Sequence, residues 1–223
     1  MLGGWTMSMT WMRMPGQSWP DAAASYLGMW VVMMVAMMMP SVAPMLSRYR
    51  QSVVKSGATC LGRLTAIVGV GYFFVWTVFG LVAFPLGVAL VTLEMQQPAL
   101  ARAVPTAAGV VVLIAGALQF TTWKARHLAC CRASPGRGRT LPADAGTVLR
   151  HGLRLGLHCG RCCAGLIANL LVIGVLDLRA MAVVAAAITV ERLAPGGERV
   201  ARAIGIVSVG AGLFLIARAA LLR

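Results

Sequence analysis

The residues best suited to chemistry are one histidine and three cysteines within the six positions HCGRCC, residues 158–163. A second cysteine pair, Cys130 and Cys131, follows the preceding apolar run, and His127 stands just before it. Thiolates and imidazoles are ligands that soft transition metals prefer, and a Cys-x-x-Cys pair also suits thiol–disulfide exchange. These two clusters are therefore the first candidates for a functional site.

The thiols of HCGRCC stand at the start of an apolar run, which places them at or near a helix N-terminus, where the helix dipole stabilises thiolates. Cys159, Cys162 and Cys163 are three and four positions apart, so they are expected to share one helix face. In an antiparallel hairpin the end of the preceding helix lies at the same side of the membrane. The pair Cys130-Cys131 is then within reach, and metal binding is favoured over thiol redox chemistry and over simple apolar packing.

Methionine forms a second pattern, because twelve of the fourteen methionines occur by position 45. Thioethers select Cu(I), although methionines on a membrane helix also serve as flexible packing. Ahead of the first apolar run, Met7, Met9, Met12 and Met14 interleave with Trp5 and Trp11. Two neighbouring helix faces carry six further methionines: Met29, Met33 and Met37 on one, and Met34, Met38 and Met45 on the other.

Composition identifies the chain as an integral membrane protein. It is 59% hydrophobic and 12% charged, whereas an ordinary globular domain has about 25% charged residues. The chain is expected to form an all-α, polytopic transmembrane bundle, with residues 1–21 as an external Met/Trp-rich segment and 22–223 as the membrane domain. About six crossings of roughly 20 residues are predicted: 22–46, 64–93, 106–124, 155–176, 180–190 and 203–222. The short 180–190 segment also fits a re-entrant half-helix.

The net charge of +14 reflects membrane orientation rather than nucleic-acid binding. Eleven of the twenty Lys and Arg residues lie in two segments, 47–63 and 124–154, which are interpreted as loops. Basic loops mark the cytoplasmic side of a membrane. Glu191, at the end of a short apolar segment, is either a functional intramembrane carboxylate or an interfacial charge. No Ser-His-Asp set or paired-carboxylate centre is apparent, so enzymatic activity is not the favoured interpretation.

Three stretches carry a family resemblance: MWVVMMVAMMMPSVAPM at 29–45, WKARHLACCR at 123–132, and the region 156–195. Together they resemble the DUF2182 family of bacterial membrane proteins, from about residue 7 to the end of the chain. The resemblance implies a metal-binding integral membrane protein, often with a further hydrophobic segment upstream. Ala164 and Gly165 depart from the family's usual aromatic and leucine. The motif residues carried over are Met37, Met38, Pro40, Pro44, Lys124, Cys131, Arg132, Cys159, Cys162, Cys163, Met181 and Glu191.

The resulting hypothesis is a membrane protein that binds a soft transition metal and transports it or hands it on. Copper is favoured as the metal, and zinc and iron stay open. The expected partners are the lipid bilayer, the metal ion or a metallochaperone, and a second copy or another subunit of a membrane complex. A thiol oxidoreductase using Cys159 and Cys162, or a scaffold subunit, are the alternatives. The candidate ligands are Cys130, Cys131, His158, Cys159, Cys162, Cys163, His127, Met33, Met37 and Met38.

Overall fold

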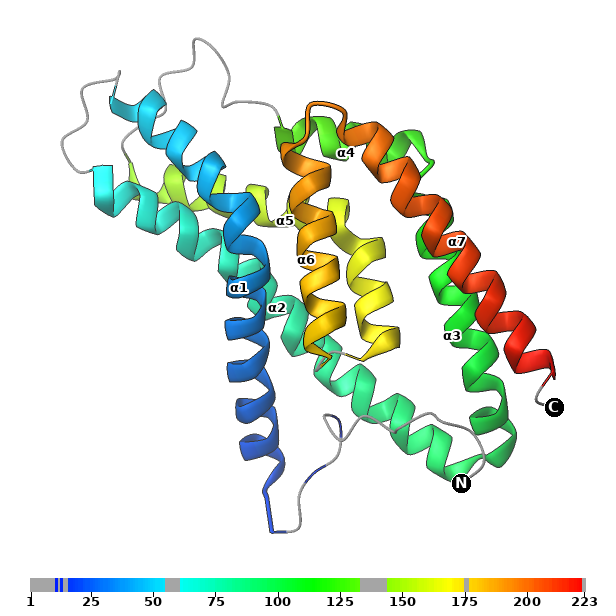
Figure 1. Ribbon diagram of the computed structural model, residues 1–223. Helices are drawn as coiled ribbons and strands as arrows, with labels where there is room; N and C mark the ends of the chain where they lie inside the picture. The colour runs from blue at the N-terminus through cyan, green and yellow to red at the C-terminus, as the bar shows by residue number, and fades with distance from the viewer. Residues whose placement is uncertain are drawn as a thin grey trace.

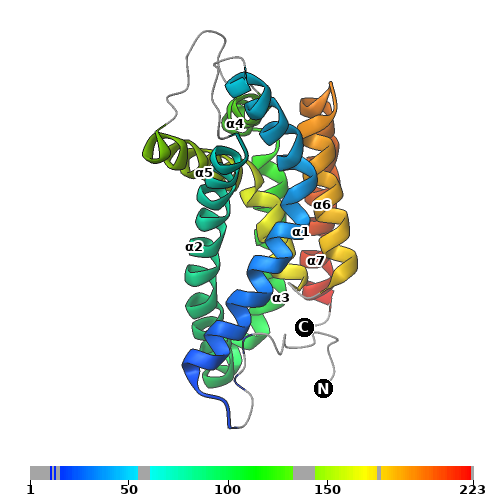
Figure 2. The same ribbon diagram turned by 90° about the vertical axis from the view of Figure 1, so that its left-hand side faces the viewer.

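Seven helices form the part of the chain that the computed structural model describes, which is residues 11, 13, 16–54, 61–132, 144–174 and 177–221. Figures 1 and 2 show them gathered into one bundle, with α4 at the same end as the last turns of α1. The all-α expectation is thus confirmed. The helices are α1 (Trp19–Val54), α2 (Leu61–Gln96), α3 (Pro98–Leu118), α4 (Thr122–Arg132), α5 (Ala145–Ile173), α6 (Leu178–Leu193) and α7 (Gly197–Leu221).

Five helices, α1, α2, α3, α5 and α7, are long and apolar enough to cross a membrane. The segment predicted over 180–190 does form a helix, α6, but α6 has only 16 residues. At about 1.5 Å per residue it extends roughly 24 Å, which is less than the roughly 30 Å of a bilayer's hydrocarbon core. By length and composition the described residues therefore contain five candidate membrane-spanning helices, one fewer than predicted. α6 is a shorter helix that packs against them.

The third predicted helix, 106–124, is divided in two. α3 begins at Pro98, where a proline at the first helical position loses no hydrogen bond, so most of the expected 94–105 connection is helical. At the end of α3, three successive backbone hydrogen bonds join residues that are three positions apart. The hydroxyl of Thr121 also donates a hydrogen bond to the Leu118 carbonyl oxygen. This tighter turn ends α3, and a new helix, α4, begins at Thr122.

Most of the two basic segments, 47–63 and 124–154, is helical. The interpretation of the whole of each segment as a loop was therefore wrong. α1 continues to Val54, well into the segment 47–63. α5 begins at Ala145, where the carboxylate of Asp144 accepts a hydrogen bond from the Thr147 amide as an N-cap. Residues 55–60 and 133–143 lie outside the described residues.

The close approach of α2 to α5 positions the site. A Cβ atom added at Gly152 of α5 would lie 2.4 Å from the Val68 carbonyl oxygen of α2, and one at Gly156 would lie 2.8 Å from the Tyr72 carbonyl oxygen. Only glycine allows two helix backbones to meet so closely. As a consequence the Tyr72 side chain faces the turn of α5 that carries the cysteines. On the other side of the bundle α3 runs along α7 (Figure 1).

Candidate functional site

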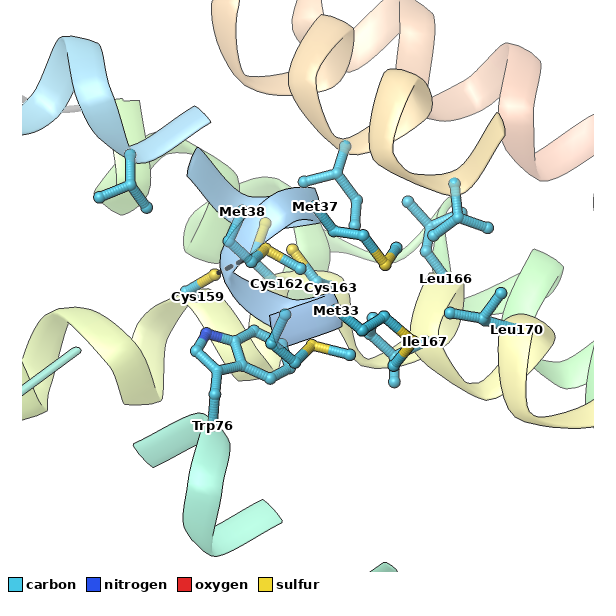
Figure 3. Packing of buried hydrophobic residues seen from close by; sticks show 14 of the residues in the cluster. Met33, Met37, Met38, Trp76, Cys159, Cys162, Cys163, Leu166, Ile167 and Leu170 are labelled. Atoms are coloured by element: carbon cyan, nitrogen blue, oxygen red, sulfur yellow. Dashed lines mark hydrogen bonds between the residues drawn. The ribbon is translucent and has the colours of Figure 1, made fainter. Parts of the chain in front are cut away.

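Three cysteines of α5 form the centre of a buried sulfur cluster. The residue exposures of Cys159, Cys162 and Cys163 are 1%, 2% and 0%, which confirms that they share an inward face. Opposite them α1 contributes buried methionines, and the Cys159 Sγ lies 4.0 Å from the Sδ of Met38. Figure 3 shows this contact, with the Met37 side chain directed toward Leu166. The cluster therefore combines thiols from one helix with a thioether from another.

The cluster lies inside α5 and not at its start, so the predicted helix N-terminus at HCGRCC was wrong. α5 begins at Ala145, roughly four turns before Cys159 at about 3.6 residues per turn. The residues between them, which include Arg150 and Arg154, contain no proline to end the helix. Because the dipole acts within the first turn, it does not reach the cysteines of the cluster.

Tyr72 of α2 provides the nearest polar contact to the thiols. Its hydroxyl lies 2.9 Å from the Cys159 Sγ, and its side chain is fully buried. One turn further along α2, the backbone carbonyl of Trp76 accepts a hydrogen bond from the indole of Trp30, at 2.8 Å. Trp30 belongs to α1, so this bond fixes the methionine-bearing helix against α2. Nothing in the sequence pattern marks Tyr72, since one tyrosine in a long apolar run is unremarkable.

A buried ion pair joins α4 to α6 next to the turn of α5 that carries Cys162. The Lys124 ammonium of α4 donates to the Glu191 carboxylate of α6 at 2.9 Å, with side chains 5% and 1% exposed. The same ammonium donates to the Cys162 carbonyl oxygen at 2.7 Å. Burial raises the pKa of the Glu191 carboxyl, and the Lys124 ammonium opposes that rise. Lys124 was expected in a basic loop, and this was wrong because it is buried in the bundle.

The two predicted histidine ligands lie where α4 packs against α5. The ring centroids of His127 and His158 are 6.1 Å apart. The His127 Nδ1 bonds the Trp123 carbonyl oxygen at 2.8 Å, whereas the buried His158 Nδ1 has no hydrogen-bond partner within the described part of the chain. Cys130 and Cys131 belong to α4, but their side chains lie outside the described residues. α4 therefore contacts α5 at the histidines, in the interior of α5 and not at its start, and the role of this cysteine pair stays a prediction.

The methionine stripe of α1 is buried as part of the same core. Met33, Met34, Met37 and Met38 are all buried, and Met29 packs against them. The segment 7–14, which is predicted to be external, lies outside the described residues except for Trp11 and Arg13.

The described cysteines and histidines do not form a metal site by themselves. Among the described residues no three His, Cys, Asp or Glu side chains are arranged to hold a metal ion. Methionine sulfur is a further soft donor, and the sulfur cluster contains Met38 beside its cysteines.

Comparison with known families identifies the family of this chain. A family model described as PpoB2, copper chaperone, matches residues 27–215, a region that contains the cysteines of α5 and the buried methionines of α1. Neither a curated protein nor a solved structure matches the chain significantly.

Proposed function

The chain belongs to this copper chaperone family, and we propose that it holds Cu(I) as cargo between α1 and α5 and passes it to a copper-requiring acceptor. The observation that carries the proposal is the buried contact between a cysteine thiol and a methionine thioether. Such a mixed set of soft sulfur donors suits Cu(I) better than zinc, calcium or magnesium.

The separation of the two sulfurs suits one ion between them. A zinc–thiolate bond is roughly 2.3 Å long, so two collinear bonds of that length separate the sulfurs by about 4.6 Å. The Cys159 and Met38 sulfurs are 4.0 Å apart, which corresponds to a bent arrangement with room for a third ligand. Cys162 and Cys163, on the same face of α5, are the available third ligands.

The polar groups around the sulfurs support this assignment. Tyr72 contacts the Cys159 thiol, and Lys124 binds the carbonyl of Cys162 while pairing with Glu191. Such outer contacts orient ligands and tune their basicity. The resemblance to the DUF2182 family also rests on Lys124, Glu191 and the cysteines. Because these residues lie next to one another, we treat them as parts of one site.

A path for copper follows from the arrangement of α1. The methionine stripe leads from Met29 through Met33 and Met37 to Met38, and the external methionines of 7–14 would collect the ion first. The histidine pair His127 and His158, together with the cysteines of α4, would offer a second station for release. The chain would sit in a bacterial inner membrane with its basic segments at the cytoplasmic face.

Burial favours metal binding over the thiol oxidoreductase alternative. A mixed disulfide forms only if an outside thiolate reaches the attacked sulfur. All three thiols of the cluster are inside the bundle, and a small ion enters such a site more readily than a protein thiol does.

The test is a Cu(I) titration of anaerobically purified protein in detergent, competed with a chromophoric chelator. We expect stoichiometric binding that is lost in the Cys159→Ser/Cys162→Ser/Cys163→Ser variant. The matched control is Cys60→Ser, which removes a thiol outside both clusters and is expected to leave binding unchanged. Equal Cu(I) binding by the triple variant and the wild type would contradict the site.

A further inference from the structure

Three arginines form a stripe along the outer side of α5. Arg150, Arg154 and Arg161 are all exposed, and their spacing of four and then seven positions places them on one face of the helix. The opposite face of α5 packs against the backbone of α2 through Gly152 and Gly156. The close contact with α2 therefore holds this arginine stripe outward, away from the interior of the bundle.

Carboxylates are scarce around the arginine stripe. The region 124–161 contains eight Lys and Arg residues but a single acidic residue, Asp144. The Asp144 carboxylate accepts a hydrogen bond from the Thr147 amide at the start of α5. Within the described part of the chain, the ion pair that forms is between Lys124 and Glu191, and it does not involve the stripe. The three guanidinium groups thus present a positive surface to which an external anion can bind.

Leucines border the arginine stripe on the same outer side. Leu149 and Leu157 are 38% and 44% exposed, and the half-buried Leu153 lies one turn from each of them. Their spacing of four positions forms an apolar edge that runs beside the arginines. A face that combines a basic edge with an apolar edge is typical of helices that lie at the boundary between lipid headgroups and acyl chains.

The length and direction of α5 place the arginine stripe near the edge of a bilayer. α5 has 29 residues, whereas about 20 residues cross the hydrocarbon core, so roughly the first nine extend beyond it. Figures 1 and 2 show these first turns running across the bundle, at the end that carries α4, whereas the last turns run beside α6. Arg161 comes later in the helix, but helical side chains point toward the N-terminus, so a long arginine there reaches back toward the edge.

We propose that the arginine stripe binds the phosphate groups of anionic phospholipids at the membrane surface. A guanidinium binds phosphate oxygens through two parallel hydrogen bonds, and the leucines lie against the acyl chains. An anionic headgroup is favoured over a zwitterionic one, because phosphatidylcholine would bring its own cation close to the arginines. The lipid site is on the face of α5 opposite to Cys159, so it is separate from the proposed copper site.

The test measures lipid binding to the purified protein in detergent micelles by native mass spectrometry. Phosphatidylglycerol and phosphatidylcholine with the same acyl chains are compared, and we expect wild type to bind phosphatidylglycerol more tightly. Each arginine near a lipid surface contributes about fivefold in affinity, so Arg150→Gln/Arg154→Gln/Arg161→Gln should bind phosphatidylglycerol roughly a hundredfold more weakly. Its binding of phosphatidylcholine should not change.

The matched control is Arg179→Gln/Arg199→Gln/Arg218→Gln, which removes three exposed arginines from α6 and α7 and should bind phosphatidylglycerol like wild type. Equal losses in the two triple variants would overturn the proposal, because net charge alone would then explain the binding. Equal affinity of wild type for the two lipids would also overturn it, and this comparison needs no variant to fold. Inorganic phosphate should not displace the lipid, and displacement would show that the arginines bind free phosphate instead of a lipid surface.

Discussion

The hydroxyl of Tyr72 and the thiol of Cys159 lie 2.9 Å apart in the interior of the bundle, and they join α2 to α5. The contact exists because glycines on α5 let the two backbones approach each other next to Tyr72. A phenol can donate to a thiolate, so the pair places a hydrogen-bond donor on the sulfur that also touches Met38. In the proposed copper site, Tyr72 would position the Cys159 sulfur.

Replacing Tyr72 by Phe should weaken Cu(I) binding about ten- to a hundredfold, because the thiolate loses its outer-shell donor. Chelator competition on the purified variant measures the change. Tyr49→Phe is the control, since Tyr49 is equally buried but belongs to a separate cluster, where it stacks on His151. Equal losses in both variants would show that the effect is not specific to the thiol contact.

Breaking the Lys124–Glu191 pair should destabilise the fold. Glu191→Gln leaves a buried ammonium uncompensated, which costs about 3–5 kcal/mol when one partner of a buried pair is removed. The double variant Lys124→Met/Glu191→Leu should recover part of that loss. Reversible unfolding in mixed micelles gives the free energies, and a single variant as stable as the wild type would refute the pairing.

Gly152→Ala should separate α2 from α5, because the added Cβ would lie 2.4 Å from the Val68 carbonyl oxygen. We expect a loss of about 1–3 kcal/mol in stability, as for other overpacked sites, together with weaker Cu(I) binding as Tyr72 moves from the thiol. Gly69→Ala on α2 has no neighbour within 4 Å and should be neutral or slightly stabilising. If both variants behave alike, close helix contact is not what positions Tyr72.

The buried thiols should react slowly with a bulky maleimide in the folded protein and rapidly after unfolding. Their side chains are enclosed by α1, α2 and α6, so labelling needs local opening of the bundle. Mass spectrometry of timed reactions follows each cysteine. Fast labelling of Cys159 or Cys162 in the folded protein would restore the oxidoreductase alternative.

Local patterns predicted the parts of the site that lie on single helices. The spacing of Cys159, Cys162 and Cys163 predicted a shared face, and that face is buried. The methionine stripe was likewise expected on α1. Both results follow from helical periodicity, which a sequence shows directly.

Contacts between distant helices were not predictable in the same way. Lys124 and Glu191 are 67 positions apart, and the charge pattern alone assigned the lysine to a loop. The start of α5 was misplaced because its basic first turns are less apolar than the turns that follow. Hydropathy marks apolar runs, whereas helix bounds depend on caps such as Asp144.

We propose that copper binds among the sulfurs of α1 and α5. X-ray absorption at the copper edge of the Cu(I)-loaded protein identifies the atoms bound to the metal, and Met38→Leu is the companion variant. We expect a first shell of sulfur alone, with one sulfur scatterer fewer in the variant. A shell dominated by nitrogen or oxygen, or a spectrum that Met38→Leu leaves unchanged, would contradict it.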